Sequence, residues 1–143
     1  MALTAEDRFE IQDLYARYAH SIDANDGEAY ASCYTRDGVF VPSTGHIAGN
    51  TYQGREKLVA LGNDLDREPP TRHWNCNYLL TERADHVEGT CYAMRIEIGG
   101  TEPVVAASAV YHDEIVKEDG QWKFRARRPK LDVQKYRATA GDR

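Results

Sequence analysis

The second half of this chain consists of strand patterns separated by turn residues, and the first half carries helical periodicity. Strands are predicted at residues 71–81, 87–98, 103–117 and 121–128, and the pair Asp119-Gly120 is typical of a hairpin turn. Strands that follow one another without intervening helices form antiparallel meanders rather than alternating βαβ units. The order of elements therefore predicts an α+β fold in which the helices come first and an antiparallel sheet follows.

The N-terminal region predicts a long amphipathic helix that ends near Asp23. Thr4 is a suitable N-cap for this helix. One apolar stripe follows at helical spacing: Ile11, Leu14, Tyr15, Tyr18 and Ile22. Asp23 lies on the flank of the stripe in the last turn, and Asp26 is suited to cap a short second helix. We therefore expect two consecutive helices with a tight corner between them.

A brief strand at residues 39–41 and a third helix after Gly54 are expected before the sheet. The 143 residues suit one domain, which we expect at residues 1–133, followed by a polar, frayed tail at residues 134–143. The sequence has no apolar run of membrane-spanning length, and its start is too charged for a secretory signal. Its three cysteines lack any paired spacing. We expect a soluble, cytoplasmic protein with free thiols.

The C-terminal region is basic although the chain as a whole is acidic. Residues 121–143 contain eight Lys or Arg and two Asp, whereas the net charge of the chain is −5. Trp122 and Phe124 alternate with the basic residues, as they do in a half-exposed strand, and this favours a solvated strand face over a nucleic-acid interface. We expect neither a nucleic-acid partner nor a membrane partner.

Two predicted strands have apolar faces that need cover. In residues 87–98 the apolar face consists of Tyr92, Met94, Ile96 and Ile98. In residues 103–117 the inner set is Val105, Ala107, Ala109, Tyr111 and Ile115, and the opposite face also carries small apolar residues. A strand that is apolar on both faces is covered on both faces. Because few helices are available, we expect another subunit to provide the second cover, in a homodimer or homotrimer.

Three short motifs resemble a known family. They are Ile11-Gln12-Asp13-Leu14-Tyr15, Ala109-Val110-Tyr111 and Asp119-Gly120-x-Trp122-Lys123-Phe124. Together with the order of elements, they resemble the SnoaL-like family of the nuclear transport factor 2-like superfamily, of the scytalone dehydratase, lindane dehydrochlorinase and bile-acid 7-alpha-dehydratase type. The resemblance covers most of residues 8–130 and implies a cone-shaped, curved antiparallel sheet wrapped around the N-terminal helices.

The resemblance also implies a set of site residues. The family's catalytic Asp–His dyad falls on Asp23 and His73, and Tyr18 stands five residues before the aspartate, as in the bile-acid dehydratases, where the dehydrochlorinase has a lysine. Substrate-binding positions fall on Phe40, Met94, Ile96, Tyr111 and Arg127. Strict alternation places Arg127 on the outer face with Lys123 and Arg125, so that only a bulge or strong curvature turns it inward.

This arrangement would suit proton transfer. A neutral histidine accepts a proton well near pH 7 when a carboxylate holds its other ring nitrogen as a donor. Asp23 would orient His73, which would act as the base, and Tyr18 would donate to a developing oxyanion or to a leaving hydroxyl. The sequence has no convincing metal-ligand spacing and no phosphate-binding loop. We therefore expect a lyase or isomerase of the dehydratase type that acts on a small hydrophobic cyclic substrate and needs neither metal nor cofactor.

Other interpretations remain open. Asp23 can simply cap the helix corner, and a lone histidine on a strand is more often structural than catalytic. The same fold also serves as a non-catalytic binding or assembly subunit, as in the small subunit of ring-hydroxylating dioxygenases. An epoxide hydrolase of the limonene type needs two acids around an arginine, and Asp113 is the one further candidate acid on the inner face.

Overall fold

The computed structural model describes residues 2–43, 49–65 and 70–132. Its elements in chain order are α1 (Ala5–Asp23), α2 (Gly27–Ser32), β1 (Tyr34–Phe40), β2 (Tyr52–Gln53), α3 (Arg55–Gly62), β3 (Thr71–Glu82), β4 (Val87–Glu97), β5 (Val104–Glu118) and β6 (Gln121–Leu131). Helices precede the long strands, which confirms the predicted α+β class. The predicted tail at 134–143 lies outside the described residues.

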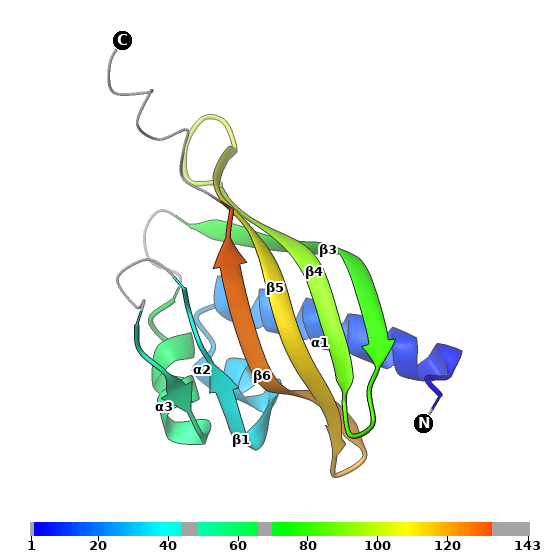
Figure 1. The fold of residues 1–143 in the computed structure, drawn as a ribbon. Coiled ribbons are helices and arrows are strands. Elements are labelled where there is room, and N and C mark those ends of the chain that lie inside the picture. Colours follow the sequence, from blue (N-terminus) through cyan, green and yellow to red (C-terminus); the bar gives the residue numbers. More distant parts are fainter. Residues whose placement is uncertain (1, 44–48, 66–69, 133–143) are drawn as a thin grey trace.

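The six strands form one curved sheet in the order β2-β1-β6-β5-β4-β3. Strands β3 to β6 are joined as antiparallel hairpins, as predicted, and α1 runs across one face of the sheet (Figure 1). Two features differ from the prediction. Strand β1 is longer than the predicted residues 39–41 and pairs with β6 in parallel, and the short strand β2 was not predicted. The pairing of β1 with β6 also shifts register between Tyr34 and Val39.

The first helix begins at the predicted cap. The Thr4 hydroxyl oxygen accepts a hydrogen bond from the Asp7 backbone N–H (3.0 Å), and the Asp7 carboxylate accepts one from the Thr4 backbone N–H (3.0 Å). This reciprocal pair satisfies two N–H groups that the helix itself leaves unpaired. The same carboxylate accepts from Lys117 Nζ and Trp122 Nε1, each at 3.0 Å. The start of α1 is therefore fixed to the β5–β6 hairpin.

Aromatic side chains fill the space between α1 and the sheet. The largest buried rings belong to Tyr15, Tyr18, Tyr30, Tyr34, Tyr111 and Phe124. Strand β4 makes room for them with small residues on its inner face, Gly89, Cys91 and Ala93. A Cβ atom at Gly89 would lie 2.5 Å from the Tyr15 hydroxyl oxygen and 2.9 Å from Ile115 Cδ1. Glycine is thus required there because the Tyr15 ring lies directly against the strand.

The predicted inner face of β4 is wrong in its first half. Tyr92 is 57% exposed, and Met94, which pairs with Trp74 and Ser108 across the sheet, shares the outer face with them. Ile96 is buried, as expected. Large apolar residues on the outer face gave the stronger periodic signal, because the inner residues are small where the rings of α1 pack against them.

The predicted inner face of β5 is confirmed only in its second half. Ala109, Tyr111 and Ile115 are buried, whereas Val105 is 59% exposed. The pairing with β4 shifts register between Arg95 and Ile96, where β5 gains one residue. A bulge of this kind changes which face the following side chains occupy. The prediction failed for Val105 because it assumed unbroken alternation.

Candidate active site

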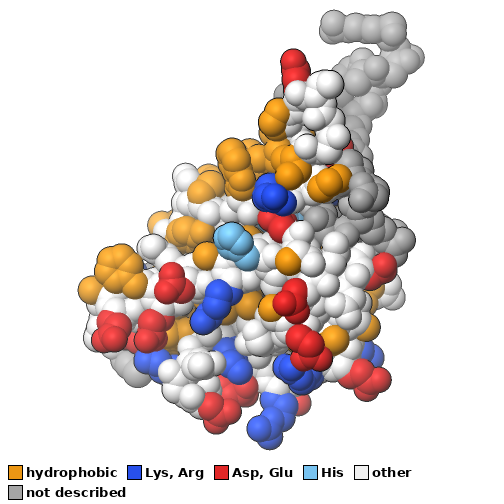
Figure 2. All heavy atoms as spheres, turned by 180° about the vertical axis from the view of Figure 1, so that it is seen from behind, with side chains coloured by type: hydrophobic (Ala, Val, Ile, Leu, Met, Phe, Trp, Pro, Cys, Tyr) orange, Lys and Arg blue, Asp and Glu red, His pale blue; other side chains and the backbone are white. Residues whose placement is uncertain are grey.

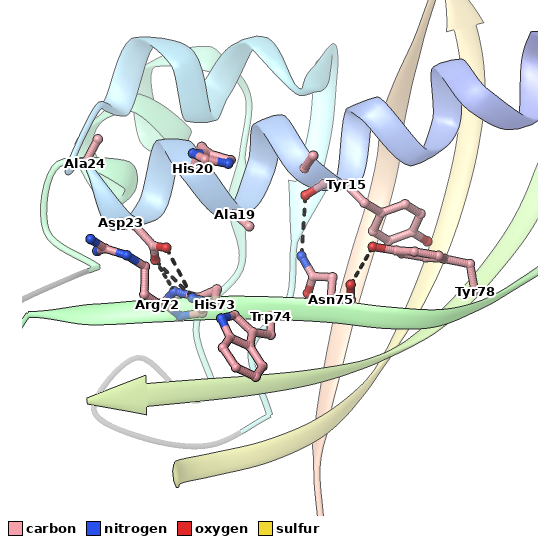
Figure 3. A pocket seen from close by; sticks show the side chains of 11 residues that line it. Tyr15, Ala19, His20, Asp23, Ala24, Arg72, His73, Trp74, Asn75 and Tyr78 are labelled. Carbon is pink, nitrogen blue, oxygen red and sulfur yellow. Dashed lines mark hydrogen bonds and ion pairs between the residues drawn. The ribbon is translucent and has the colours of Figure 1, made fainter. Parts of the chain in front are cut away.

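An open groove of about 640 Å³ lies between α1 and β3, the strand at one edge of the sheet. Figure 3 shows it from close by. Its lining consists of Tyr15, Ala16, Ala19, His20, Asp23, Ala24, Arg72, His73, Trp74, Asn75 and Tyr78. The helix contributes mostly small residues to this surface, and the strand contributes polar and aromatic ones. A groove of this size is suitable for a small organic molecule.

The end of α1 brings Asp23 to the groove. The Ala24 backbone N–H donates to the His20 carbonyl oxygen (3.1 Å), which closes the last turn. Asn25 then adopts a left-handed conformation with φ of 50°. This conformation ends a helix and is more accessible to Asn than to most residues. Asp23 therefore stands in the final turn, as predicted, on the side that faces β3.

Asp23 is in direct contact with His73. The distance between His73 Nδ1 and Asp23 Oδ1 is 2.7 Å, and the His73 backbone N–H points at both carboxylate oxygens, each at 3.2 Å. Both side chains are mostly but not fully buried, with exposed fractions of 12% for His73 and 13% for Asp23. The carboxylate thus fixes the position of the strand backbone as well as the imidazole. The structure brings together the two residues that the sequence analysis singled out.

This contact determines which ring nitrogen is available. An ionised carboxylate only accepts hydrogen bonds, so His73 Nδ1 carries the hydrogen in this pair. In the neutral imidazole the other nitrogen, Nε2, then has a free lone pair. The contact with Asp23 therefore leaves Nε2 of His73 as the ring nitrogen that can accept a proton.

The other end of the groove is formed by a bulge in β3. Cys76 pairs with Tyr92 and Leu79 with Thr90, so two residues of β3 lie opposite one residue of β4. Asn77 has a φ of 56° within this bulge. The bulge turns Tyr78 toward α1, where its ring centroid lies 4.8 Å from that of Tyr15. Two aromatic rings in contact, tilted by 46° to each other, therefore close the groove opposite the dyad.

Asn75 connects the two sides of the groove near this end. Its side-chain Nδ2 donates to the Tyr15 backbone carbonyl oxygen (3.4 Å). The backbone carbonyl oxygen of Asn75 accepts from the Tyr78 hydroxyl (2.6 Å). Figure 3 shows both bonds, which join helix to strand and close the bulge. Asn75 lies two positions from His73 on β3, so both side chains belong to the same face of the strand.

The other predicted site residues do not line this groove. Phe40, Ile96 and Tyr111 are buried elsewhere, and Met94 lies on the outer face. Tyr18 is 1% exposed, behind Tyr15, and burial raises the pKa of its hydroxyl well above the usual value. The roles assigned to these residues from the resemblance stay predictions.

Arg127 is turned inward by a bulge, as the sequence analysis required. In the β5–β6 ladder, Glu114 pairs with Ala126 and Ile115 with Phe124, so Arg125 is the additional residue. After this additional residue, the odd-numbered positions of β6 point inward in place of the even-numbered ones. Arg127 is therefore fully buried.

The guanidinium of Arg127 is enclosed by an acid and by aromatic rings. Nε and Nη2 each donate to Asp113, both at 2.8 Å, and the Tyr15 hydroxyl donates to the same carboxylate (2.7 Å). The guanidinium carbon lies 4.0 Å from the centroids of Tyr18 and Phe124. Burial alone would lower the pKa of the Arg127 guanidinium, but the attraction of the Asp113 carboxylate and the hydrogen bonds to it together outweigh this effect and raise the pKa above its usual value. Its Nη1 has no hydrogen-bond partner among the described residues. Asp113, the acid named for the hydrolase alternative, is therefore held by Arg127 and Tyr15 inside the core.

Sequence reasoning missed several residues of the groove. His20 is exposed and lies at the groove. Its spacing of three residues from Asp23 on the same helix could have indicated that the two side chains share one helix face. Tyr78 had no such signal, because its direction depends on the bulge at Asn77. In the described parts of the chain, no three or more His, Cys, Asp or Glu side chains are grouped as a metal site requires. None of the described helices is long and apolar enough to cross a membrane.

Comparisons with known proteins identify related structures. A Mycobacterium tuberculosis protein of unknown function is 27% identical, with a TM-score of 0.77 over 94% of this chain and 80% of its own. LinA is 26% identical, with a TM-score of 0.74 over 90% of this chain and 87% of its own. An ntf2-like protein with a cystatin-like fold from Novosphingobium aromaticivorans is 20% identical, with a TM-score of 0.78 over 96% of this chain and 90% of its own, a likeness of fold alone. No curated protein sequence matches the chain.

A family sequence profile covers most of the chain. The profile of the SnoaL-like domain matches residues 3–128, from the cap of α1 to the last strand. The solved relatives share the fold over most of the chain, with TM-scores between 0.74 and 0.78, which supports the same assignment. The chain belongs to the SnoaL-like domain family and has the nuclear transport factor 2-like fold that its sequence resembles.

Proposed function

We propose that this protein is a cofactor-independent lyase or isomerase in which His73, oriented by Asp23, removes a proton from a hydrophobic cyclic substrate. The observation that carries the proposal is the 2.7 Å contact between His73 Nδ1 and Asp23 Oδ1 at the side of an open groove. SnoaL-like proteins include dehydratases and isomerases, which agrees with this chemistry.

The proposed step begins at Nε2 of His73. This nitrogen takes a proton from a carbon next to a carbonyl or similar activating group, and the electron pair enters the new double bond. The positive charge that forms on the ring is stabilised by the Asp23 carboxylate. A base held in this way contributes about 10²- to 10⁴-fold in rate. The protonated imidazole then returns the proton, either to a departing hydroxyl, which gives dehydration, or to another carbon, which gives isomerisation.

The lining of the groove supports a flat apolar substrate. Tyr15 and Tyr78 offer ring surfaces, and Ala16 and Ala19 leave space beside the helix, whereas the Trp74 ring lies on the other side of β3 (Figure 3). Figure 2 shows Lys, Arg, Asp and Glu side chains intermixed on the helix side of the molecule, without a large area of one sign. Such a surface does not favour a highly charged ligand such as a nucleic acid. These features support a small uncharged ring compound as the ligand.

The test is a screen for proton exchange and elimination. A panel of cyclic ketones and β-hydroxy ketones is incubated in D₂O with the wild-type protein, and NMR follows deuterium uptake and loss of water. For any compound that reacts, His73→Gln and Asp23→Asn are expected to lower the rate about 10²- to 10⁴-fold. His112→Gln, which changes an exposed histidine on β5, is the matched control and keeps the wild-type rate. Normal turnover by both dyad variants would rule out the mechanism.

A second candidate function is that of a non-catalytic assembly subunit, and the outer face of the sheet favours it. Three residues of this face are each more than half exposed: Trp74, Tyr92 and Val105. Exposed aromatic and β-branched residues on one face of a sheet are typical of a protein interface. The same face supports our expectation of a homo-oligomer. Isolation of the protein in a stable complex with a larger, unrelated chain would favour the assembly function.

A further inference from the structure

Within the groove, one polar atom is buried without a hydrogen-bond partner. This atom is the side-chain oxygen of Asn75, Oδ1, which accepts no hydrogen bond from any of the residues that the structure describes. Asn75 itself lines the groove. Buried acceptors in folded proteins are nearly always paired, so an unpaired one beside a binding groove indicates a donor that comes with the ligand.

The orientation of the Asn75 side chain is fixed by its neighbour. Nδ2 donates to the Tyr15 carbonyl oxygen (3.4 Å), and that carbonyl can only accept. Rotating the amide by half a turn would place two acceptors against each other. The strand is also held at this residue, because the Tyr78 hydroxyl donates a hydrogen bond to the backbone carbonyl oxygen of Asn75 (2.6 Å). Oδ1 is therefore a preset acceptor in a rigid part of the groove wall.

The separation between Asn75 and His73 limits the kind of ligand. The two residues are two positions apart on one strand, so their side chains point to the same face, about 6 to 7 Å apart at the backbone. One ring compound with a substituent is therefore large enough to contact both side chains. A ring compound whose reacting carbon lies at His73 would therefore bring a substituent on its far side to Asn75.

We propose that Asn75 is a specificity-determining residue whose Oδ1 accepts a hydrogen bond from a ring hydroxyl of the substrate. The proposal rests on the proposed function for its choice of substrate, but its effect on binding is measured separately from turnover. It narrows the substrate class to hydroxylated ring compounds, with the recognised hydroxyl on the far side of the ring from the carbon that loses its proton. A site built to accept from a hydroxyl discriminates against the analogue that lacks the donor, because the buried oxygen then stays unpaired.

The test uses a pair of probes that differ in this donor. 2-Naphthol has a hydroxyl donor, and 2-methoxynaphthalene has the same rings but no donor. Dissociation constants for both are measured by NMR titration or calorimetry with the wild-type protein. We expect 2-naphthol to bind about five- to tenfold more tightly, the usual effect of one neutral hydrogen bond. Equal affinities for the two probes would overturn the proposal.

Three variants locate the effect. Asn75→Leu has nearly the same shape without the acceptor and is expected to bind both probes equally. Asn75→Ala removes the acceptor without placing another group against the Tyr15 carbonyl and is also expected to lose the preference for 2-naphthol, which covers the case in which the leucine variant does not fold. His73→Gln is expected to keep the preference. Loss of the preference in His73→Gln, or its persistence in Asn75→Leu, would show that the hydroxyl binds at the dyad and not at Asn75.

The two proposals can fail independently. A protein that prefers 2-naphthol through Asn75 but catalyses no proton exchange would contradict the proposed function and leave the subsite intact. Exchange that depends on His73, with no preference between the probes, would contradict only the subsite.

Discussion

The Asp23 carboxylate accepts hydrogen bonds from both the backbone N–H and the ring Nδ1 of His73. One side chain thus joins the end of α1 to the edge strand β3 and also sets the orientation of the imidazole. Positioning and electrostatics are combined in a single side-chain contact, which is how a catalytic base is held by a rigid scaffold. The same contact is expected to matter for both activity and local structure.

A change of Asp23 separates these two roles. In Asp23→Asn the side chain keeps its size and one acceptor oxygen but loses its negative charge. We expect the rate with any reactive substrate to fall about 10²-fold or more, because the imidazolium that forms is no longer stabilised. The melting temperature, measured by calorimetry, should change much less than in Asp23→Ala. Equal loss of stability in the two variants would mean that the charge serves structure rather than proton transfer.

The buried pair Arg127–Asp113 predicts strong non-additivity. Arg127→Met leaves the Asp113 carboxylate without its cationic partner in the core and is expected to destabilise the protein by about 3–5 kcal/mol. The double variant Arg127→Met with Asp113→Leu removes both charges and is expected to recover most of that loss. Unfolding in urea of the wild-type protein, of Arg127→Met, of Asp113→Leu and of the double variant gives the four free energies that the comparison needs. Additive effects of the two changes would contradict the geometry of this pair.

The close packing of Gly89 against Tyr15 predicts a sensitive position. Gly89→Ala places a methyl group 2.5 Å from the Tyr15 hydroxyl oxygen, so the ring has to move. We expect a loss of about 1–3 kcal/mol in unfolding free energy, as for other overpacked sites. Gly100→Ala is the matched control, since its nearest neighbouring atom would lie 3.8 Å away. A Gly89→Ala protein as stable as the control would show that Tyr15 does not rest on β4.

The cap of α1 predicts a dependence of stability on pH. Hydrogen bonds from Thr4, together with those from Lys117 and Trp122, hold the pKa of the Asp7 carboxyl well below its usual range. A depressed pKa in the folded state stabilises the protein above the ordinary aspartate pKa, and this contribution is lost as pH falls below about 4. In the wild-type protein the unfolding free energy should therefore decrease as the pH falls below about 4. This decrease should be smaller in Asp7→Asn and partly reduced in Lys117→Met. An unchanged acid slope in Asp7→Asn would refute this assignment.

The exposed outer face of the sheet predicts self-association. Gel filtration with light scattering is expected to give a dimer or trimer of the 16.2 kDa chain. Tyr92→Glu, which adds a charge to this face, should shift the protein toward the monomer. Phe9→Glu is the control, because Phe9 is equally exposed but lies on α1. A wild-type protein that elutes as a monomer would contradict the expectation.

The sequence predicted the order of helices and strands because local rules decide it, whereas the pairing of Asp23 with His73 was implied by the resemblance to the SnoaL-like family. Thr4, the apolar stripe and the left-handed Asn25 define α1, so the position of Asp23 follows from helix geometry. His73 follows from strand alternation on β3. The residues that were misplaced lie where bulges interrupt alternation: Val105 was assigned to the wrong face, Tyr78 was not predicted, and strict alternation put Arg127 on the outer face, although a bulge turns it into the core. Met94 was misassigned for a different reason, since a single sequence does not distinguish an apolar outer face from an inner one.

The most direct test of the dyad is the protonation of the His73 ring. Nitrogen-15 NMR of the imidazole near neutral pH distinguishes a ring that carries its hydrogen on Nδ1 from one that carries it on Nε2. We predict the Nδ1–H form in the wild-type protein and a shift away from it in Asp23→Asn. A wild-type ring with its hydrogen on Nε2, or the same spectrum in both proteins, would contradict the claim that Asp23 prepares His73 as a base.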